Sequence, residues 1–253
     1  MCHKVNKVCC AYACGAVLLL FVYLQIEPKF KCNNTNIKGD FHLVVSDLHV
    51  HPYERLTDYR MQKVVQQARK QWKIEKTLIL GDLMHWAGGL TFSHSNLTML
   101  QWDTMVKRVK FIINDTNAIY VPGNHDLGNV STHRWNVAFG AYDKQVHLFS
   151  NVTAYLASSM KPQPHNLPVV LAHYPIENMH NPLYHQHLKL ALNGHKHLIE
   201  RRAIGGALQY TLPTLNPYQS ISNNHFDGSG EQGFALLNSA LQVRMCKVYY
   251  LWA

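Results

Sequence analysis

Short apolar runs alternate with longer amphipathic stretches in the first half of the chain, after residue 38. Runs typical of buried strands occupy residues 41–45, 77–80 and 118–121. Between them, residues 58–72 and 96–113 carry apolar side chains at the three- and four-residue spacing of a helix that buries one face. This β-α-β-α-β order predicts an α/β domain built on a sheet.

The second half of the chain has strand patterns but little helical periodicity. Strand-like runs fall at residues 168–172, 188–192, 233–237 and 241–251. A sandwich of sheets flanked by helices fits both halves. We expect residues 39–253 to form this domain and residues 27–38 to be a linker before it.

The composition is that of a folded chain with a sizeable core. Hydrophobic residues make up 47%, charged residues 15% and aromatic residues 11% of the 253 positions, which excludes a disordered chain. The formal net charge is +9, but the basic residues are scattered, so we expect no nucleic-acid partner. The chain has 17 histidines, and neutral imidazole is the commonest metal ligand.

An uncharged segment precedes the domain. Residues 9–26 contain no charged side chain, and 18 residues in a helix can span a thin bilayer. Lys4 and Lys7 precede this segment, which predicts that residues 1–8 face the cytosol and that the domain lies across the membrane. A cleaved signal peptide and a buried core helix are the alternatives.

Two further features fit a domain that faces a lumen. Five Asn-x-Ser/Thr sequons are candidate glycosylation sites, and they are Asn33, Asn96, Asn114, Asn129 and Asn151. Beyond residue 26 the chain holds only Cys32 and Cys246. These two cysteines can pair in an oxidising compartment or stay free, and their spacing does not decide between the two states.

Polar side chains of a few kinds follow the predicted strands. They are Asp47, His49, Asp82, Asn124, His125, Asp126, His173, His195 and His197. Because loops at the carboxyl ends of strands in an open α/β sheet meet at one crevice, we expect these side chains to converge. Buried carboxylates are stable there when cations lie among them. Oxygen and imidazole ligands without thiolates suit Mn²⁺, Zn²⁺ or Fe²⁺.

The spacing within these motifs has a geometric meaning. In an extended segment, residues two apart point to the same side, so Asp47 and His49 can bind one ion together. His195 and His197 repeat this spacing. Glycines at positions 81, 123 and 194 permit tight turns that bring the following side chain toward the metal.

Taken together, the motifs resemble those of the calcineurin-like metallophosphoesterase superfamily. That pattern is Asp-x-His, Gly-Asp, Gly-Asn-His-Asp, a single His and Gly-His-x-His in this order, and residues 46–197 contain all five blocks. The resemblance implies a four-layer αββα sandwich with two divalent metal ions at its crest. It also implies hydrolysis of a phosphoester by a water that the two ions activate.

Carried over residue by residue, the resemblance gives each motif side chain a role. The ligands of one ion are Asp47, His49, Asp82 and His197. Those of the second ion are Asp82, as a bridge, with Asn124, His173 and His195. His125 lies beside the ions and protonates the leaving group, and Asp126 holds the His125 ring in place. Two sister families differ, because this chain lacks the arginine of Ser/Thr protein phosphatases and has His85 where purple acid phosphatases have tyrosine.

A finer resemblance is to the GPI-anchor remodelling phosphoesterases. The N-terminal segment carries it together with VPGNHDLGN at residues 121–129, AHYP at 172–175 and TLPTLNPY at 211–218. It implies Mn²⁺ as the usual ion, removal of ethanolamine phosphate from a GPI glycan, GPI-anchored proteins as partners and a place in the endoplasmic reticulum or Golgi. The second membrane helix of that family has no counterpart, because residues 233–253 are too polar to span a bilayer.

Two other functions remain open from the sequence. One is a phosphatase or phosphodiesterase that acts on another lipid or on nucleotides. The other is a membrane-tethered binding protein whose metal site is vestigial. A superfamily motif does not separate these functions, because the substrate is chosen by the surroundings of the site.

Overall fold

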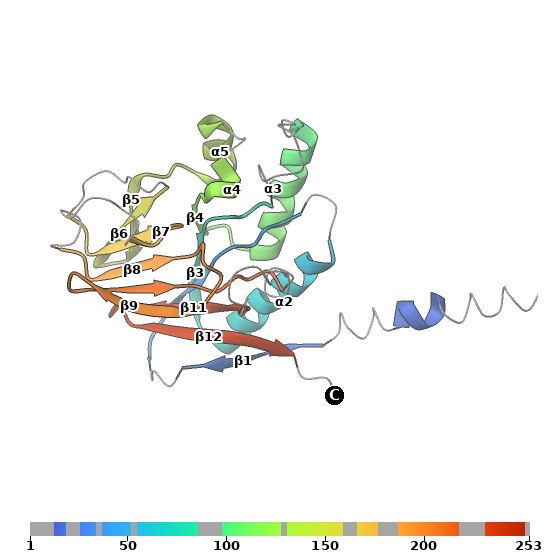
Figure 1. The fold of residues 1–253 in the computed structure, drawn as a ribbon, viewed down its shortest axis with the longest axis horizontal. Coiled ribbons are helices and arrows are strands. Elements are labelled where there is room, and N and C mark those ends of the chain that lie inside the picture. Colours follow the sequence, from blue (N-terminus) through green and yellow to red (C-terminus); the bar gives the residue numbers. More distant parts are fainter. Residues whose placement is uncertain are drawn as a thin grey trace, which may run out of the picture.

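The computed structural model describes the chain at residues 13–18, 26–33, 37–51, 55–85, 98–127, 131–158, 166–176, 187–217 and 231–250. Over these ranges two six-stranded sheets lie face to face, and helices cover the outer face of the first sheet (Figure 1). The α/β prediction is therefore confirmed.

The first sheet has the strand order β1-β12-β11-β2-β3-β4. Its parallel part consists of β2 (Phe41–Val45), β3 (Ile74–Leu80) and β4 (Ile119–Val121). Antiparallel pairing continues the sheet through β11 (Gly233–Asn238), β12 (Val243–Tyr250) and β1 (Pro28–Cys32). The strands predicted from apolar runs are all present here, with ends that differ by a few residues.

The second sheet has the order β5-β6-β7-β8-β10-β9. Its members are β5 (Lys144–Phe149), β6 (Val152–Ala157), β7 (Val169–Ala172), β8 (Leu190–Asn193), β9 (Glu200–Ile204) and β10 (Ala207–Thr211). Only β7 and β8 were predicted, because they are fully buried and continuously apolar. The edge strands β5 and β9 expose at least half of their side chains, so they lack the apolar runs on which the prediction relies.

Two long helices follow the first two strands of the parallel part. They are α2 (Leu56–Gln71) and α3 (Met99–Ile113). α3 begins with a capping box. The backbone N–H of Gln101 donates to the Thr98 hydroxyl, and the backbone N–H of Thr98 donates to the side-chain oxygen of Gln101. The short α4 (Asn124–Leu127) and α5 (Thr132–Phe139) follow β4.

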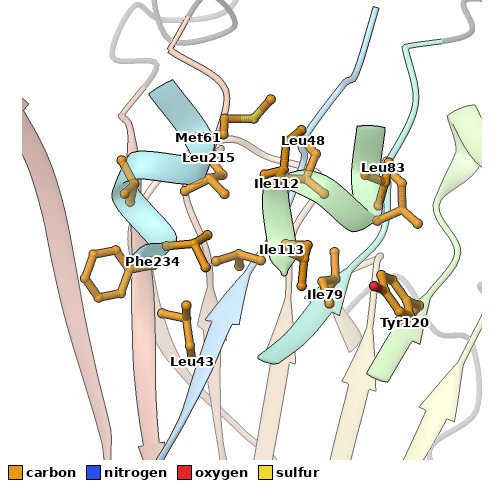
Figure 2. Packing of buried hydrophobic residues seen from close by; sticks show 14 of the residues in the cluster. Leu43, Leu48, Met61, Ile79, Leu83, Ile112, Ile113, Tyr120, Leu215 and Phe234 are labelled. Atoms are coloured by element: carbon orange, nitrogen blue, oxygen red, sulfur yellow. The ribbon is translucent and has the colours of Figure 1, made fainter. Parts of the chain in front are cut away.

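The first sheet separates two apolar layers of the core, because side chains along a strand point alternately to its two faces. On β2, Leu43 faces the helices whereas Val44 faces the second sheet. Figure 2 shows the first layer, in which Ile112 of α3 and Met61 of α2 lie over Leu43 and Ile79 of the sheet. Because both faces of β2 are buried, all of its residues except His42 are apolar.

The expected fourth layer is not found in the part of the chain that the structure describes. Val170, Ala172 and Ala191 lie on the outer face of the second sheet and are buried there, but no described helix covers them. Residues 159–165 and 177–186 lie outside the described ranges. The described architecture therefore has three layers, helices, sheet and sheet, which agrees with the weak helical periodicity of the second half.

The predicted linker at residues 27–38 is corrected by the structure. Its residues 28–32 form β1, which pairs with β12 at the edge of the first sheet. Cys32 lies opposite Cys246 in this pairing, with 4.0 Å between their Cα atoms, and the two form a disulfide. The domain therefore begins at β1, and the bond joins positions 214 residues apart.

The N-terminal segment is described only in part. Residues 13–18 are helical and their side chains are exposed, while residues 9–12 and 19–25 lie outside the described ranges. Within those ranges no helix has both the length and the apolar character needed to cross a membrane. The carbonyl of Ile26 accepts a hydrogen bond from Arg60 of α2 at 3.0 Å, so the end of the segment is held against the domain.

Candidate metal centre

The side chains singled out in the sequence meet at one end of the sandwich. Each lies at or just beyond the carboxyl end of a strand, with β2, β3 and β4 contributing from the first sheet and β7 and β8 from the second. The strands β2, β3 and β4 are parallel in the first sheet, and β7 and β8 are parallel in the second. In each sheet the loops that follow these strands therefore lie at one edge, and the two edges together form the crest.

One group of ligand atoms comprises Asp47, His49 and His197, which lie within 4.8 Å of one another. Nε2 of His197 is 3.1 Å from Oδ1 of Asp47 and 3.2 Å from Nε2 of His49. Asp47 is fully buried and His49 is 3% exposed, so water does not solvate them freely. This close packing of a carboxylate and two imidazoles requires a cation or shared protons.

A second group comprises Asp82, His173 and His195. Nε2 of His173 is 3.3 Å from Oδ2 of Asp82, 3.2 Å from Nδ1 of His195 and 2.9 Å from Oδ1 of Asn124. Oδ2 of Asp82 also lies 3.7 Å from Nε2 of His49 in the first group. Asp82 is thus the carboxylate that lies between the two groups.

The arrangement fits divalent metal ions. Ligand atoms about 2.0–2.2 Å from one ion lie about 3.0–3.4 Å from their neighbours. The closest separations within the two groups, from 3.1 to 3.3 Å, fall in this range. The donors are carboxylate oxygens, one amide oxygen and imidazole nitrogens, which suit Mn²⁺, Zn²⁺ or Fe²⁺.

Backbone strain is concentrated at this crest. Positive φ angles occur at five of its non-glycine residues, which are Asp47, His49, Asp82, His195 and His197. Such angles are uncommon for residues with a Cβ, and each costs roughly 1–3 kcal/mol when the surroundings impose it. The expected extended segment at Asp47 and His49 is therefore corrected. The two side chains converge because the loop curves through left-handed conformations, and two-residue alternation is not the cause.

Two glycines allow the loops to approach one another. A Cβ added at Gly194 would overlap the Ser46 hydroxyl and an oxygen of Asp47. A Cβ added at Gly123 would overlap an oxygen of Asp82. The role of these glycines is therefore close approach to the carboxylates, more than the freedom to turn that the sequence indicated.

Asp126 does not hold the His125 ring as expected. Its carboxylate accepts hydrogen bonds from the backbone N–H groups of Gly123 at 2.8 Å, Met84 at 3.1 Å and Leu83 at 3.2 Å. These bonds join the loop after β4 to the loop after β3. Asp126 therefore fixes the backbone that presents Asp82 and Asn124.

His125 lies beside the two groups. Its backbone N–H donates to Oδ1 of Asp82 at 2.9 Å, and its ring Nε2 is 3.9 Å from Oδ2 of the same carboxylate. The ring is half-buried and partly open to solvent. This position next to the carboxylate that lies between the groups suits an acid that meets a substrate.

The segment after β10 supports the loop of Asp47 and His49, and no motif in the sequence indicates this role. The Thr214 hydroxyl donates to the carbonyl of Asp47 at 2.7 Å. The Asn216 amide donates to the carbonyl of Leu48 at 2.9 Å and to that of His49 at 3.3 Å. Both residues lie within the TLPTLNPY stretch, which had been noted only for its resemblance.

Charges in the crest are strongly coupled. Burial favours the neutral acids, yet hydrogen bonds from His197 and His173 hold the pKa values of Asp47 and Asp82 below their usual range. Burial lowers the pKa of His49 to about 3. Burial also opposes protonation of His173, but the Asp82 carboxylate raises its pKa to about 9. In the absence of metal, a proton on His173 thus compensates one carboxylate.

Comparison with known protein families assigns the chain to one of them. The family model of the calcineurin-like phosphoesterases matches residues 43–199, which include both ligand groups. The chain therefore belongs to the calcineurin-like phosphoesterase family, which indicates a phosphoester hydrolase and which typically binds divalent metals. A comparison with curated protein sequences gives no match.

Solved structures with a related fold are distant in sequence. An archaeal phosphodiesterase has a TM-score of 0.46 and 11% identity, covering 83% of this chain and 99% of its own. Vacuolar Protein Sorting 29 from Cryptosporidium parvum has a TM-score of 0.46 and 16% identity, with coverages of 85% and 92%. Phosphopantetheinyl hydrolase from Mycobacterium tuberculosis has a TM-score of 0.41 and 10% identity, with coverages of 69% and 90%. The family assignment rests on the sequence match.

Proposed function

We propose that this chain is a dinuclear metal-dependent phosphodiesterase. The observation that carries the proposal is the pair of ligand groups with Asp82 between them, since Oδ2 of Asp82 is 3.3 Å from His173 in one group and 3.7 Å from His49 in the other. A carboxylate in this position can bridge two ions. The assignment of each ligand to an ion remains part of the proposal.

The residues divide the chemistry between them. Two divalent ions, when bound, neutralise phosphoryl oxygens and acidify the attacking water. Asp47, His49 and His197 would hold one ion, and His173, His195 and Asn124 would hold the other. His125, beside Asp82, would donate a proton to the leaving alkoxide, a contribution of about 10²–10⁴-fold in rate. The buried walls of the crest strengthen each of these charge interactions.

We propose Mn²⁺ as the natural ion. The proposed ligands are four imidazoles, two carboxylates and one amide oxygen, with no thiolate among them. Such a donor set does not select zinc as a cysteine site would, and it suits Mn²⁺, Zn²⁺ and Fe²⁺ alike. Among these ions, the resemblance to the GPI-anchor remodelling phosphoesterases favours Mn²⁺.

For the substrate we propose the ethanolamine phosphate branch of a GPI glycan, on GPI-anchored proteins in the endoplasmic reticulum or Golgi. The support is the sequence resemblance at residues 121–129, 172–175 and 211–218. The first two stretches contribute the proposed ligands Asn124 and His173, and the third contributes Thr214, whose hydroxyl donates to the carbonyl of Asp47. A disulfide between Cys32 and Cys246 fits an oxidising lumen. The sequon residues Asn33, Asn114 and Asn151 are exposed, as glycan acceptors must be, and Asn96 and Asn129 lie outside the described residues.

The first experiment measures hydrolysis by the full chain in detergent after metal removal. Bis(p-nitrophenyl) phosphate and p-nitrophenyl phosphate serve as diester and monoester, each with and without Mn²⁺. We expect Mn²⁺ to restore diester cleavage and His125→Ala to reduce it at least 100-fold without loss of bound metal. Preference for the monoester would make the chain a phosphatase. Metal binding without cleavage of either ester would favour the tethered binding protein.

The substrate proposal has a separate test in cells that lack this chain. We expect GPI glycans released from their surface to retain an additional ethanolamine phosphate by mass spectrometry. Re-expression of the chain should remove the excess, and re-expression of the Asp82→Ala variant should not. Unchanged glycans in the deficient cells would exclude this substrate. The proposed phosphodiesterase activity would then act on a different substrate.

A further inference from the structure

The two nitrogen atoms of the His49 ring face different surroundings. Nε2 points to the first ligand group, 3.2 Å from Nε2 of His197 and 3.8 Å from Oδ1 of Asp47. A nitrogen that binds a metal ion must carry no proton. The proton of the neutral His49 ring therefore lies on Nδ1, on the side of the ring away from the ion.

This buried Nδ1–H group needs an acceptor. His49 is 3% exposed, and metal-binding histidines almost always donate their other ring N–H to a nearby group. Nδ1 of His85 lies at hydrogen-bonding distance from Nδ1 of His49, at 3.4 Å. A neutral His85 that carries its proton on Nε2 has a lone pair on Nδ1 and can accept this bond.

The backbone holds His85 in register with the loop that carries His49. The His85 N–H donates to the carbonyl of Val50 at 3.0 Å, and the Val50 N–H donates to the carbonyl of Leu83 at 2.9 Å. Val50 and Met84 also form an isolated parallel bridge. Main-chain bonds thus join the two loops, so the backbone positions from which the two rings project are fixed relative to one another.

We propose that His85 is a positioning residue that accepts the Nδ1–H of His49 and thereby orients His49 toward the first metal ion. The ring of His85 also stacks on that of His125, with 5.7 Å between centroids and 16° between planes. One side chain thus adjoins both a metal ligand and the proposed acid. The inference rests on the proposed dinuclear centre and adds a residue outside the five motifs.

Three variants of the full chain test this role by Mn²⁺ binding, measured by equilibrium dialysis with metal analysis. His85→Asn keeps an acceptor oxygen close to the position of Nδ1, whereas His85→Leu has similar bulk and no acceptor. His51→Leu is the control, because it removes a different imidazole, whose ring centroid lies 5.6 Å from that of His85, and leaves His85 in place. Thermal unfolding of each metal-free variant shows whether it is folded.

We expect His85→Leu to weaken one of two bound Mn²⁺ equivalents by about 10- to 100-fold. His85→Asn and His51→Leu should stay within about threefold of the natural chain, since the former retains the acceptor and the latter leaves His85 unchanged. Unchanged affinity in His85→Leu would overturn the proposal, as would equal losses in the Asn and Leu variants. A third bound equivalent that both His85 variants lose would also overturn it, because His85 would then be a ligand.

If His85→Leu fails to fold, His85→Gln replaces it, since its acceptor lies farther from the ring position of Nδ1. Affinity that ranks Asn above Gln supports the proposal, and the reverse order contradicts it. Binding is measured without turnover, so the outcome is separate from that of the proposed function. Loss of affinity in His85→Leu in a chain that cleaves no phosphoester would reject the function and keep the role of His85.

Discussion

Single residues at the crest are fixed by their backbone as much as by their side-chain contacts. Asp47, His49 and Asp82 adopt positive φ angles, and the surrounding chain must hold them there. Gly194 and Gly123 leave the space into which the carboxylates fit. Small changes of shape at these positions should therefore affect metal binding before they affect the fold.

Gly194→Ala should weaken Mn²⁺ binding at least tenfold. The added methyl group would overlap the Ser46 hydroxyl and Asp47, so the loops must move apart and separate the ligands. Gly140→Ala is the matched control, because nothing lies within 4 Å of its added Cβ, although its φ of 90° makes the variant somewhat less stable. Dialysis against Mn²⁺ measures both, and equal affinities would contradict the close approach described here.

Metal binding should release protons. In the metal-free site the Asp82 carboxylate raises the pKa of His173 to about 9, so at pH 7.5 this ring is protonated. An ion requires the neutral ring, so binding expels the proton and the affinity should rise as the pH increases toward 9. Calorimetry in buffers of different ionisation enthalpy counts the protons. We expect at least one per filled centre, and a count of zero would refute this charge arrangement.

At the scale of elements, the sequence predicted the strands that carry the site better than the segments that support it. The runs around Leu43, Ile79 and Val170 are buried on both faces and are therefore apolar and easy to recognise. Edge strands such as β5 and β9 have exposed, polar side chains, and their pairing depends on distant segments. Predictions from local pattern fail there because the partner strand is not local.

The same distinction applies to the site. Motif spacing identified the side chains that the structure brings together, because each follows its strand directly. Thr214 and Asn216 act on the backbone of residues more than 160 positions away, which no local pattern reveals. Asp126 belongs to a motif, but its carboxylate binds backbone N–H groups of the loops after β3 and β4, contacts that the motif does not reveal.

Thr214→Val tests the support from the segment after β10. It keeps the shape of the side chain but removes the hydroxyl. That hydroxyl donates to the carbonyl of Asp47 and accepts from the backbone N–H of Asn216. We expect unfolding to become easier by about 1–3 kcal/mol, because a buried carbonyl loses its donor. Urea denaturation measures this loss, with Thr153→Val on β6 as the control. A Thr214 variant as stable as the control would show that the loop needs no such support.

At the scale of the whole molecule, the two ends of the domain meet at one edge of the first sheet. β1 and β12 pair there, and the disulfide between Cys32 and Cys246 closes almost the entire domain into one loop. Ile26 is bound to α2 beside the same edge. The N-terminal segment therefore leaves the domain from a fixed point beside this edge.

Removing this disulfide should destabilise the domain as a whole. Cys32→Ser should lower the free energy of unfolding by about 2–5 kcal/mol, because the unfolded chain gains the freedom that the cross-link removes. The crest lies on other strands, so the folded variant should bind Mn²⁺ as the natural chain does. Urea denaturation under oxidising conditions measures the loss. Equal stability of the variant and the natural chain would show that β1 is held by pairing alone.

The central claim is that two ions in the groups joined by Asp82 create the hydrolytic site. The most direct test titrates the metal-free chain with Mn²⁺ while bound metal and diester cleavage are measured on the same samples. The account predicts two ions per chain, cleavage that appears as the second ion binds, and fewer than two ions with no cleavage in Asp82→Ala. Full cleavage with one ion or none, or an Asp82→Ala chain with full metal content and turnover, would contradict it.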